Sequence, residues 1–287
     1  MELIVKNEPG FSVVLNLDQI NHRIWVYDYN IENPALLYDF FMKLSEDRGC
    51  EKVIFPVRQN HLSTLLQQGF TKEGMIEGYY QGSDAHFLAA YPSADRGHSA
   101  VLLNEQQMIK EITARPRGIH KNLEEGFNIK IASEKDVNVM AHLFSEVFSS
   151  YPTAVDDPCY LAHAMESEDL YMVIYDDKER LAAVATAEID WEYRRAELTN
   201  CATHPDYRGM GLNRILLQEL EQQCLAKNIF CLYSLARASS FGMNLVLHRL
   251  GYHFKGILIN NCHIAGKYED MNIWVKPTLE EDKNLVQ

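Results

Sequence analysis

The sequence predicts an α/β protein made of two units, and three observations carry this prediction. Segments with strand-like apolar runs alternate with segments whose apolar residues have helical spacing. Residues 196–213 have the pattern of a strand, a sharp turn and the glycine-bearing start of a helix. The order of expected elements in residues 1–93 recurs near the C-terminus, which indicates a small unit in front of a larger one.

Composition limits the class of protein. The chain has 287 residues, of which 47% are hydrophobic and 23% charged, as in an ordinary soluble globular protein. It has no apolar run near the ~20 residues that span a bilayer, and no secretory signal at its start. The six cysteines lack C-x-x-C spacing, so we expect no metal site, no disulfide framework and a cytoplasmic location. A net charge of −13 disfavours nucleic acid and suits a cationic small molecule, although a soluble acidic surface gives the same charge.

Residues 1–93 contain the signals of a small α/β unit. Asn33 and Pro34 are typical of a helix start, and Gly49 follows the expected end of that helix. Gly69 closes a second, shorter helix in the same way. The expected elements are strands at 11–17 and 22–29, a helix at 35–48, a strand at 52–57, a helix at 60–68 and a hairpin at 73–80 and 84–91.

Residues 94–126 have the character of a linker, with an expected helix at 103–114 and a break at 115–118. The second domain, 127–277, opens with a strand at 127–131 and a helix at 134–148 that Ser133 and Asp136 cap. We then expect a short helix ending at 165, a hairpin at 170–175 and 181–189, a strand at 194–203 and a helix at 212–227. Residues 278–287 are charged and should fray.

One order of elements occurs twice along the chain. The order is a helix, a strand ending in arginine, a short helix, a Gly-aromatic pair and a hairpin ending in proline. In the first copy the arginine, glycine and proline are Arg58, Gly69 and Pro92, and in the second they are Arg237, Gly251 and Pro277. The Arg-to-Gly interval is 11 residues in the first copy and 14 in the second, and the Gly-to-Pro interval is 23 and 26. Residues 1–93 are therefore interpreted as a degenerate half-copy, with convergent α/β patterning as the alternative.

Residues 196–213, AELTNCATHPDYRGMGLN, are where the chemistry is expected. After the strand and the turn, an R-G-x-G sequence opens a helix with leucines at helical spacing. Glycine lets the backbone approach an anion closely, and the first turn of a helix adds free N–H groups and a favourable dipole. A tight turn before any helix gives the same letters, so the motif alone leaves both interpretations open.

This stretch resembles the acetyl-CoA signature of the GNAT superfamily of N-acetyltransferases, Q/R-x-x-G-x-G/A. Arg208 and Gly211 meet the signature, whereas Asn213 stands where Gly or Ala is usual. Segments 234–252 and 256–277 look like the C-terminal half of the β-lysine N-acetyltransferases. The resemblance covers about 127–277 well and implies a GNAT fold, a mixed central sheet flanked by helices. The half-domain 1–93 would then be GNAT-like and, lacking R-x-x-G-x-G, would bind no cofactor.

The resemblance implies acetyl-CoA as co-substrate and no metal. In the family the strand end pairs with pantetheine through its backbone and the loop amides hold the pyrophosphate. The expected cofactor contacts are Cys201, Ala202, Thr203, Arg208, Gly209, Met210, Gly211, Leu212, Asn213 and Asn244. Cys201 is not expected to act as a nucleophile, because no basic partner lies near it in sequence.

Acyl transfer to an amine needs a base, because an alkyl ammonium has a pKa of about 10.4. Glu197 lies six residues before Thr203, the place of the family's glutamate base. The alternative for Glu197 is a salt bridge to Arg194 or Arg195.

The family's tyrosine acid would fall at Leu247, four residues before Gly251, so no acid is carried over. Tyr252, Tyr233 and His248 are the alternatives, although His248 has the pattern of a surface residue. The thiolate could also leave without an enzymic acid.

The loop 149–160, SSYPTAVDDPCY, resembles the acceptor wall of the β-lysine enzymes in its Tyr-Pro and Asp-Pro pairs. Asp157 also suits a helix cap before Pro158. The expected acceptor contacts are Tyr151, Asp156, Glu188 and Arg237.

The resulting hypothesis is acetyl transfer from acetyl-CoA to the terminal amine of β-lysine, which gives a compatible solute. The alternatives are another amine, such as lysine, a polyamine or a protein N-terminus, and a non-catalytic acyl-CoA sensor. No nucleic acid or membrane partner is expected, and the oligomeric state stays open, with a homodimer as one option.

Overall fold

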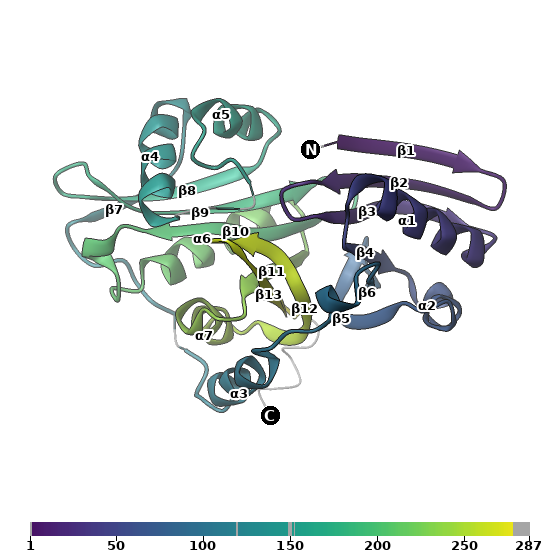
Figure 1. The fold of residues 1–287 in the computed structure, drawn as a ribbon. Coiled ribbons are helices and arrows are strands. Elements are labelled where there is room, and N and C mark those ends of the chain that lie inside the picture. The colour runs from purple at the N-terminus through teal and green to yellow at the C-terminus, as the bar shows by residue number, and fades with distance from the viewer. Residues whose placement is uncertain (1, 119, 149–150, 152, 278–287) are drawn as a thin grey trace.

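The computed structural model describes residues 2–118, 120–148, 151 and 153–277, and Figure 1 shows its helices packed on the faces of a long twisted sheet. The elements of the N-terminal part, in chain order, are β1 (Glu2–Glu8), β2 (Phe11–Asp18), β3 (Arg23–Ile31), α1 (Pro34–Arg48), β4 (Lys52–Val57), α2 (Gln59–Gln67), β5 (Thr71–Tyr80) and β6 (Ser83–Ala90). A 3-10 turn, η1 (Ala94–Gly97), and helix α3 (Leu102–Thr113) follow.

The C-terminal part supplies the remaining elements. They are β7 (Phe127–Ile131), η2 (Glu134–Asp136), α4 (Val137–Val147), α5 (Pro158–Glu166), β8 (Leu170–Asp176), β9 (Leu181–Asp190), β10 (Arg195–Thr203), η3 (Pro205–Tyr207), α6 (Leu212–Ala226), β11 (Cys231–Arg237), α7 (Phe241–Arg249), β12 (His253–Ile264) and β13 (Lys267–Val275). No helix among the described residues is both long and apolar enough to cross a membrane.

The described strands form one continuous 13-stranded sheet in the order β1-β2-β3-β4-β6-β5-β12-β13-β11-β10-β9-β8-β7. The two halves of this order mirror each other about the β5–β12 contact. Each half has a parallel pair, β3–β4 and β10–β11, with a helix between its strands, α1 and α6 respectively. The repeated order expected from the sequence is therefore present, while β7, α4 and α5 have no N-terminal counterpart.

Strand β1 was not expected from the sequence. It pairs antiparallel with β2 from Glu2↔Leu17 to Glu8↔Phe11 and forms an edge of the sheet. Most of its residues are exposed, so no alternation of apolar and polar residues reveals it.

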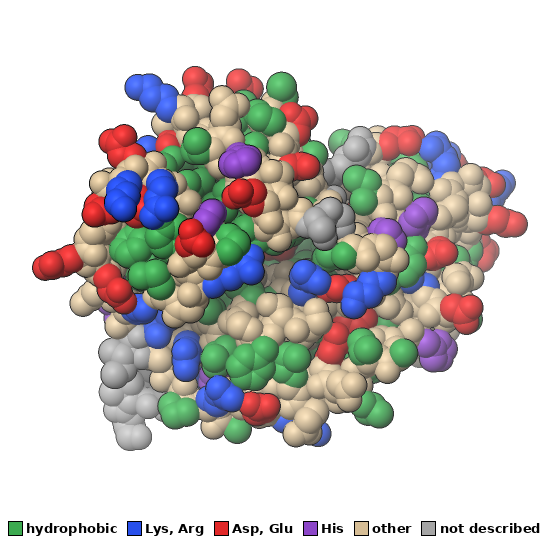
Figure 2. Space-filling model, turned by 60° about the vertical axis from the view of Figure 1, so that its left-hand side comes forward, with side chains coloured by type: hydrophobic (Ala, Val, Ile, Leu, Met, Phe, Trp, Pro, Cys, Tyr) green, Lys and Arg blue, Asp and Glu red, His purple; other side chains and the backbone are tan. Residues whose placement is uncertain are grey.

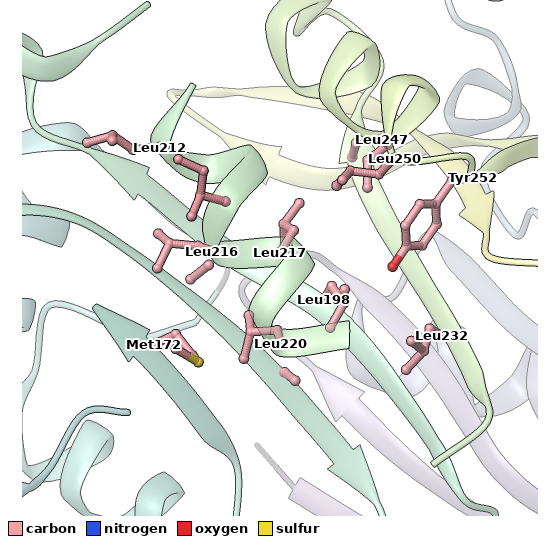
Figure 3. Packing of buried hydrophobic residues seen from close by; sticks show 14 of the residues in the cluster. Met172, Leu198, Leu212, Leu216, Leu217, Leu220, Leu232, Leu247, Leu250 and Tyr252 are labelled. Atoms are coloured by element: carbon pink, nitrogen blue, oxygen red, sulfur yellow. The ribbon is translucent and has the colours of Figure 1, made fainter. Parts of the chain in front are cut away.

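Helix α6 packs against the strands that carry the site. Its leucines, among them Leu212, Leu216 and Leu220, lie against Leu198 of β10 and Leu232 of β11 (Figure 3). All five side chains are at most 3% exposed. Because the first turn of α6 is anchored in this core, the loop before it has a fixed position beside β10.

The seam between β5 and β12 is unusual because its residue-to-residue pairing is confined, in the described chain, to Gly74 and Gly256. A Cβ at Gly256 would lie 2.2 Å from the Glu73 carbonyl oxygen, and Gly256 has a φ of +149°. The two backbones therefore approach more closely than side chains allow.

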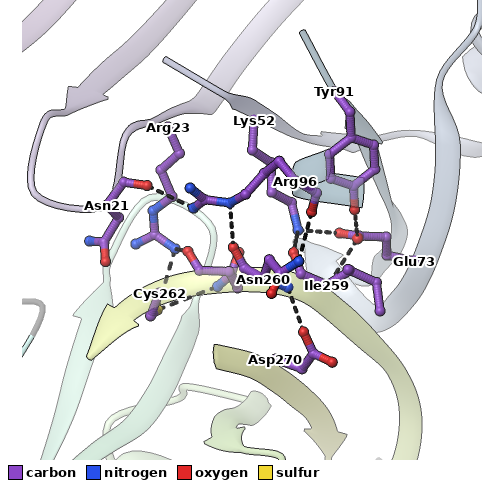
Figure 4. Close-up of polar contacts among 11 residues, drawn as sticks. Asn21, Arg23, Lys52, Glu73, Tyr91, Arg96, Ile259, Asn260, Cys262 and Asp270 are labelled. Atoms are coloured by element: carbon purple, nitrogen blue, oxygen red, sulfur yellow. Dashed lines mark hydrogen bonds and ion pairs between the residues drawn. The ribbon is translucent and has the colours of Figure 1, made fainter. Parts of the chain in front are cut away.

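Side chains of the N-terminal half continue the seam by binding the backbone of β12 (Figure 4). Lys52 Nζ donates to the Ile259 carbonyl at 2.6 Å and pairs with Glu73 Oε2 at 2.8 Å, although Lys52 is 0% exposed. Arg96 Nε and Arg23 Nη1 donate to the next two carbonyls, at 2.7 and 3.0 Å. The N-terminal half thereby fixes the backbone of a strand that borders the cleft described next.

Candidate active site

A cleft of about 1180 Å³ is lined by both halves of the chain. Figure 2 shows a hollow near the middle of one face, with Lys and Arg side chains beside it. The C-terminal half supplies β9, β10, β11 and the start of α6. The lining residues from the N-terminal half include Asp18, Arg23, Trp25, Tyr27 and Tyr79.

Strands β10 and β11 part inside this cleft. They pair in parallel from Arg195↔Cys231 to Glu197↔Tyr233, and no later pair joins them in the described chain. Asn200 has a φ of +49° within a bulge in the β9–β10 pairing. Backbone groups at the end of β10 are thus directed into the cleft, where an extended ligand can pair with them.

The loop before α6 has the geometry of an anion site. Gly209 and Gly211 have φ values of +82° and +75°, which favour glycine, and nothing lies within 4 Å of a Cβ built on Gly209. Gly211 caps α6 without a side-chain hydrogen bond, so the N–H groups of the first turn stay available. Leu212 contributes backbone alone, because its side chain is 3% exposed in the core.

Asn213, which departs from the usual Gly or Ala, is accommodated. Its Oδ1 accepts a hydrogen bond from Thr203 Oγ1 at 2.9 Å and so ties the helix start to the strand end. Arg208 lies beside this contact, with Nε 3.4 Å from the Thr203 carbonyl oxygen. Met210 is partly buried against the core and does not line the cleft; its N–H donates to the Tyr207 carbonyl at 3.4 Å and its carbonyl accepts from Lys121 Nζ, so its expected cofactor contact stays a prediction.

Glu197 and Glu188 are directly opposite each other on β10 and β9, and both line the cleft. Burial raises the pKa of Glu197, the Glu188 charge raises it further, and Arg23 acts in the opposite direction. Burial also raises the pKa of Glu188, whose Oε1 accepts from Asn200 Nδ2 at 2.9 Å. A carboxylate in this state is a stronger base than one in water.

The salt bridge considered for Glu197 is absent from the described contacts. Arg195 donates to Asp190 Oδ2 at 2.6 Å, and its guanidinium lies 3.5 Å from the centre of the Tyr79 ring. Arg194 lies over Trp191, 5.9 Å from the ring centre. Both arginines are therefore directed to partners other than Glu197.

A family model for the acetyltransferase (GNAT) family matches residues 137–252. N-acetyltransferase YodP of Bacillus subtilis (strain 168) is 37% identical over 267 residues, which are 93% of this chain and 96% of that protein. The chain belongs to the GNAT family. The beta-lysine N(6)-acetyltransferase of Methanococcus maripaludis is 27% identical over 92% of this chain and 95% of its own length. The enzyme of the same name from Methanosarcina mazei is 34% identical over 72% of this chain and 84% of its own.

Membership of the GNAT family shows that the chain is an acetyl-CoA-dependent N-acetyltransferase, so the sensor alternative falls away. Among the described residues, no group of three or more His, Cys, Asp or Glu side chains is arranged to hold a metal ion. Cys201 lines the cleft, but burial raises the pKa of its thiol to about 12, so it is not the thiolate that covalent catalysis needs.

Asn244 was wrongly expected to contact the cofactor. It is 0% exposed, and its Nδ2 donates to the carbonyls of Arg237 and Ser240 at 2.9 and 2.7 Å. Its Oδ1 accepts from Asn272 Nδ2 at 2.8 Å and Trp274 Nε1 at 2.7 Å. Two donors and two lone pairs are all used, so this side chain instead joins β11, α7 and β13.

Of the two acceptor contacts expected from the loop, one lines the cleft and the other does not. Tyr151 lines the cleft and stacks on Phe148 with ring centres 4.3 Å apart, whereas residues 149, 150 and 152 lie outside the described residues. Asp156 is exposed and does not line the cleft, so that expectation is corrected. The reason is local: Val155 is buried at 1%, and Asp157 Oδ1 caps α5 by accepting from Cys159 N at 2.9 Å.

Arg237 lines the cleft but already has a partner. Its Nε and Nη2 bind the two carboxylate oxygens of Glu269 at 2.6 and 2.7 Å, which raises its pKa. It stays a prediction for acceptor binding, with much of its charge neutralised.

Of the three general-acid alternatives, Tyr233 lines the cleft and the other two do not. Tyr252 is 1% exposed in the core under α6. His248 was expected at the surface but is 5% exposed, with Nε2 2.8 Å from the Arg115 carbonyl oxygen. Burial raises the pKa of Tyr233 well above its usual value, so it is a weak acid at neutral pH.

Sequence reasoning missed the cleft residues of the N-terminal half and Asp169. Asp169 precedes β8 and its Oδ1 accepts from Ile189 N at 2.9 Å, which places it beside Glu188. Burial raises the pKa of Asp169 to about 6. No local motif identifies these residues, because the pairing of strands far apart in sequence brings them together.

Proposed function

We propose that this acetyltransferase acetylates the terminal amine of β-lysine, with Glu197 as general base. Two relatives over most of this chain carry the name beta-lysine N(6)-acetyltransferase. The observation that supports a cationic acceptor is the facing pair Glu188 and Glu197, half-buried beside the point where β10 and β11 part. An entering ammonium favours ionisation of both carboxylates, which burial and mutual repulsion oppose in the empty cleft.

In this proposal the thioester lies along the splayed end of β10, and the loop at 208–213 holds the pyrophosphate. Residues 201–203 supply backbone partners for pantetheine. Glu197 removes a proton from the bound ammonium, and the neutral amine attacks the thioester carbonyl. The C–S bond then breaks, the amide nitrogen loses its second proton, and the departing CoA thiolate takes up a proton to leave as the free thiol. Tyr151 and Glu188 border the acceptor, and the chain's own base supplies the proton transfer.

We further propose that residues 1–93 form a degenerate half-domain without a cofactor site, joined by the linker 94–126 to the catalytic domain 127–277. The start of α1 supports this, since it corresponds to the glycine loop before α6. Asn33 Oδ1 accepts from Leu36 N at 3.3 Å, and Glu32 N and Asn33 N both bind the Gly10 carbonyl at 2.8 Å. Pro34 has no N–H, so this helix start offers little to an anion.

An acceptor screen tests the proposed function. Purified protein with acetyl-CoA is given β-lysine, α-lysine or 1,5-diaminopentane, and free thiol release is followed. A kcat/KM for β-lysine at least ~10-fold above the other two supports the proposal, since a buried polar site discriminates against a misplaced partner. A higher kcat/KM for the diamine or for α-lysine would contradict β-lysine as the acceptor and would indicate that the cleft binds another amine.

A further inference from the structure

A second cavity lies beside the glycine loop and is strongly basic. It encloses about 760 Å³, and its described lining has five Arg or Lys side chains and no Asp or Glu. The five are Arg115, Arg117, Lys121, Arg214 and Arg249. The chain has 27 Lys and Arg against 40 Asp and Glu, so this clustering runs against the overall charge.

The cavity is formed where the linker crosses two helices of the catalytic domain. The described residues of this part of the linker, 115–118 and 120–122, are called the strap. Gly118 N donates to the Arg249 carbonyl at the end of α7, at 3.1 Å. The backbone of Lys121 exchanges two hydrogen bonds with the Gln218 side chain of α6, at 3.2 and 3.1 Å. These bonds fix the cations of the strap against those of the helices.

Three of the five cations have no acidic partner among the described residues. Arg115 pairs with Glu111 and Lys121 with Glu124, whereas Arg117, Arg214 and Arg249 have no such contact. Arg214 is packed so tightly that a Cβ on Gly118 would lie 2.6 Å from its Nη2. Its Nε is buried without a hydrogen-bond partner. Burial and the neighbouring Arg249 both lower the pKa of Arg214, as expected where cations gather without an anion.

The cavity is contiguous with the catalytic cleft. Arg249 lines both spaces, and Lys121 Nζ donates to the Met210 carbonyl within the glycine loop. A ligand whose pyrophosphate lies on that loop therefore has its outer end within reach of the strap.

We propose that this basic cavity binds the 3′-phosphate of coenzyme A. A phosphate monoester carries close to two negative charges at neutral pH, and arginine forks match its oxygens in pairs. The inference rests on acetyl-CoA as the donor. It gives the linker a role in donor recognition: the strap carries cations to a phosphate that the glycine loop does not reach.

The test compares acetyl-CoA with acetyl-3′-dephospho-CoA by calorimetry on the full chain. The wild type should bind acetyl-CoA roughly 10–100-fold more tightly, the range expected for charge-assisted hydrogen bonds. In Arg117→Gln/Arg214→Gln this ratio should fall to about 3-fold or less, with the dephospho donor bound as before. Lys6→Gln/Arg48→Gln is the matched control, because it removes the same charge from surface ion pairs of the N-terminal half and should keep the ratio.

Inorganic phosphate gives a further reading: it can occupy the glycine loop with either donor present, but it should weaken acetyl-CoA more than the dephospho donor because only acetyl-CoA also needs the basic cavity. Arg117→Gln alone, at an exposed residue, gives a second reading if the double variant melts early. Equal wild-type affinity for the two donors overturns the inference and leaves the proposed function intact, as does a double variant that weakens both donors alike. A wild type that binds neither donor overturns both.

Discussion

Replacing Glu197 by glutamine separates the base from every structural role of this side chain. Glutamine keeps the size and the hydrogen bonding but cannot take a proton. An amine with a pKa of about 10.4 is roughly 0.04% neutral at pH 7, so an unassisted reaction loses about three orders of magnitude. General-base catalysis contributes ~10²–10⁴-fold. We expect kcat at pH 7 to fall by at least ~100-fold, with acetyl-CoA affinity unchanged.

The pH dependence of the rate gives a second reading. Burial and Glu188 raise the pKa of Glu197, so the wild-type rate should rise through that raised value as the carboxylate forms. The Glu197→Gln rate should continue to rise toward the pKa of the amine itself. Turnover is measured from pH 6 to 10 with free thiol detection, and Glu192→Gln, at an exposed position outside the cleft, is the control.

The effect of Glu197→Gln on thermal stability should be opposite to the effect of breaking a salt bridge. A carboxyl whose pKa is raised on folding binds more protons in the native state, so stability falls as pH rises from the unfolded value through the raised one. Glutamine removes this loss, and the variant should melt at the wild-type temperature near pH 4 and above it near pH 8. A variant that melts earlier yet turns over normally at pH 7 would refute the assignment of Glu197 as base.

Three further predictions concern the loop, the seam and the N-terminal half. Gly211→Asp should abolish acetyl-CoA binding, because the added carboxylate repels the pyrophosphate and strains a φ of +75°; near-normal calorimetric affinity in a folded variant would refute the loop site. Lys52→Met leaves Glu73 buried without its cation and should lower the free energy of unfolding by about 3–5 kcal/mol in urea titrations. Lys6→Met, in an exposed pair, should stay within about 1 kcal/mol, and equal losses would contradict this account. Calorimetry of the full chain should give one acetyl-CoA per chain, and two would contradict a half-domain without a cofactor site.

Sequence patterns predicted the helices and strands whose bounds depend on neighbouring residues in the chain. The expected strand 52–57 has the same bounds as β4, and the helix expected from residue 212 begins there, because Gly211 in a left-handed conformation fixes its start. Residues 201–203, expected to contact the cofactor through their backbone, lie beyond Glu197, the last residue of β10 that pairs with β11 in the described chain.

Residues set by tertiary contacts were the ones that sequence reasoning missed. Asn244 is of a residue type that can bind a ligand, but all four hydrogen bonds of its side chain are made to other residues of the protein. Asp156 and Asp157 look alike in sequence and both are exposed; Asp157 caps α5, and neither lines the cleft. Arg23 lines the cleft because the N-terminal half of the sheet lies opposite β10. No local sequence pattern predicts this placement.

The seam has a consequence for how the two halves recognise each other. Backbone pairing alone is indifferent to sequence, and an exposed strand edge pairs with any other strand that it meets. Here the edge of β12 is covered through the Gly74–Gly256 contact and through Lys52, Arg96 and Arg23, each bound to one carbonyl. These contacts need a glycine and three cationic side chains at fixed places, so they depend on sequence in a way that backbone pairing does not. The N-terminal half, through residues up to Arg96, therefore covers a strand edge that would otherwise be exposed on the catalytic half.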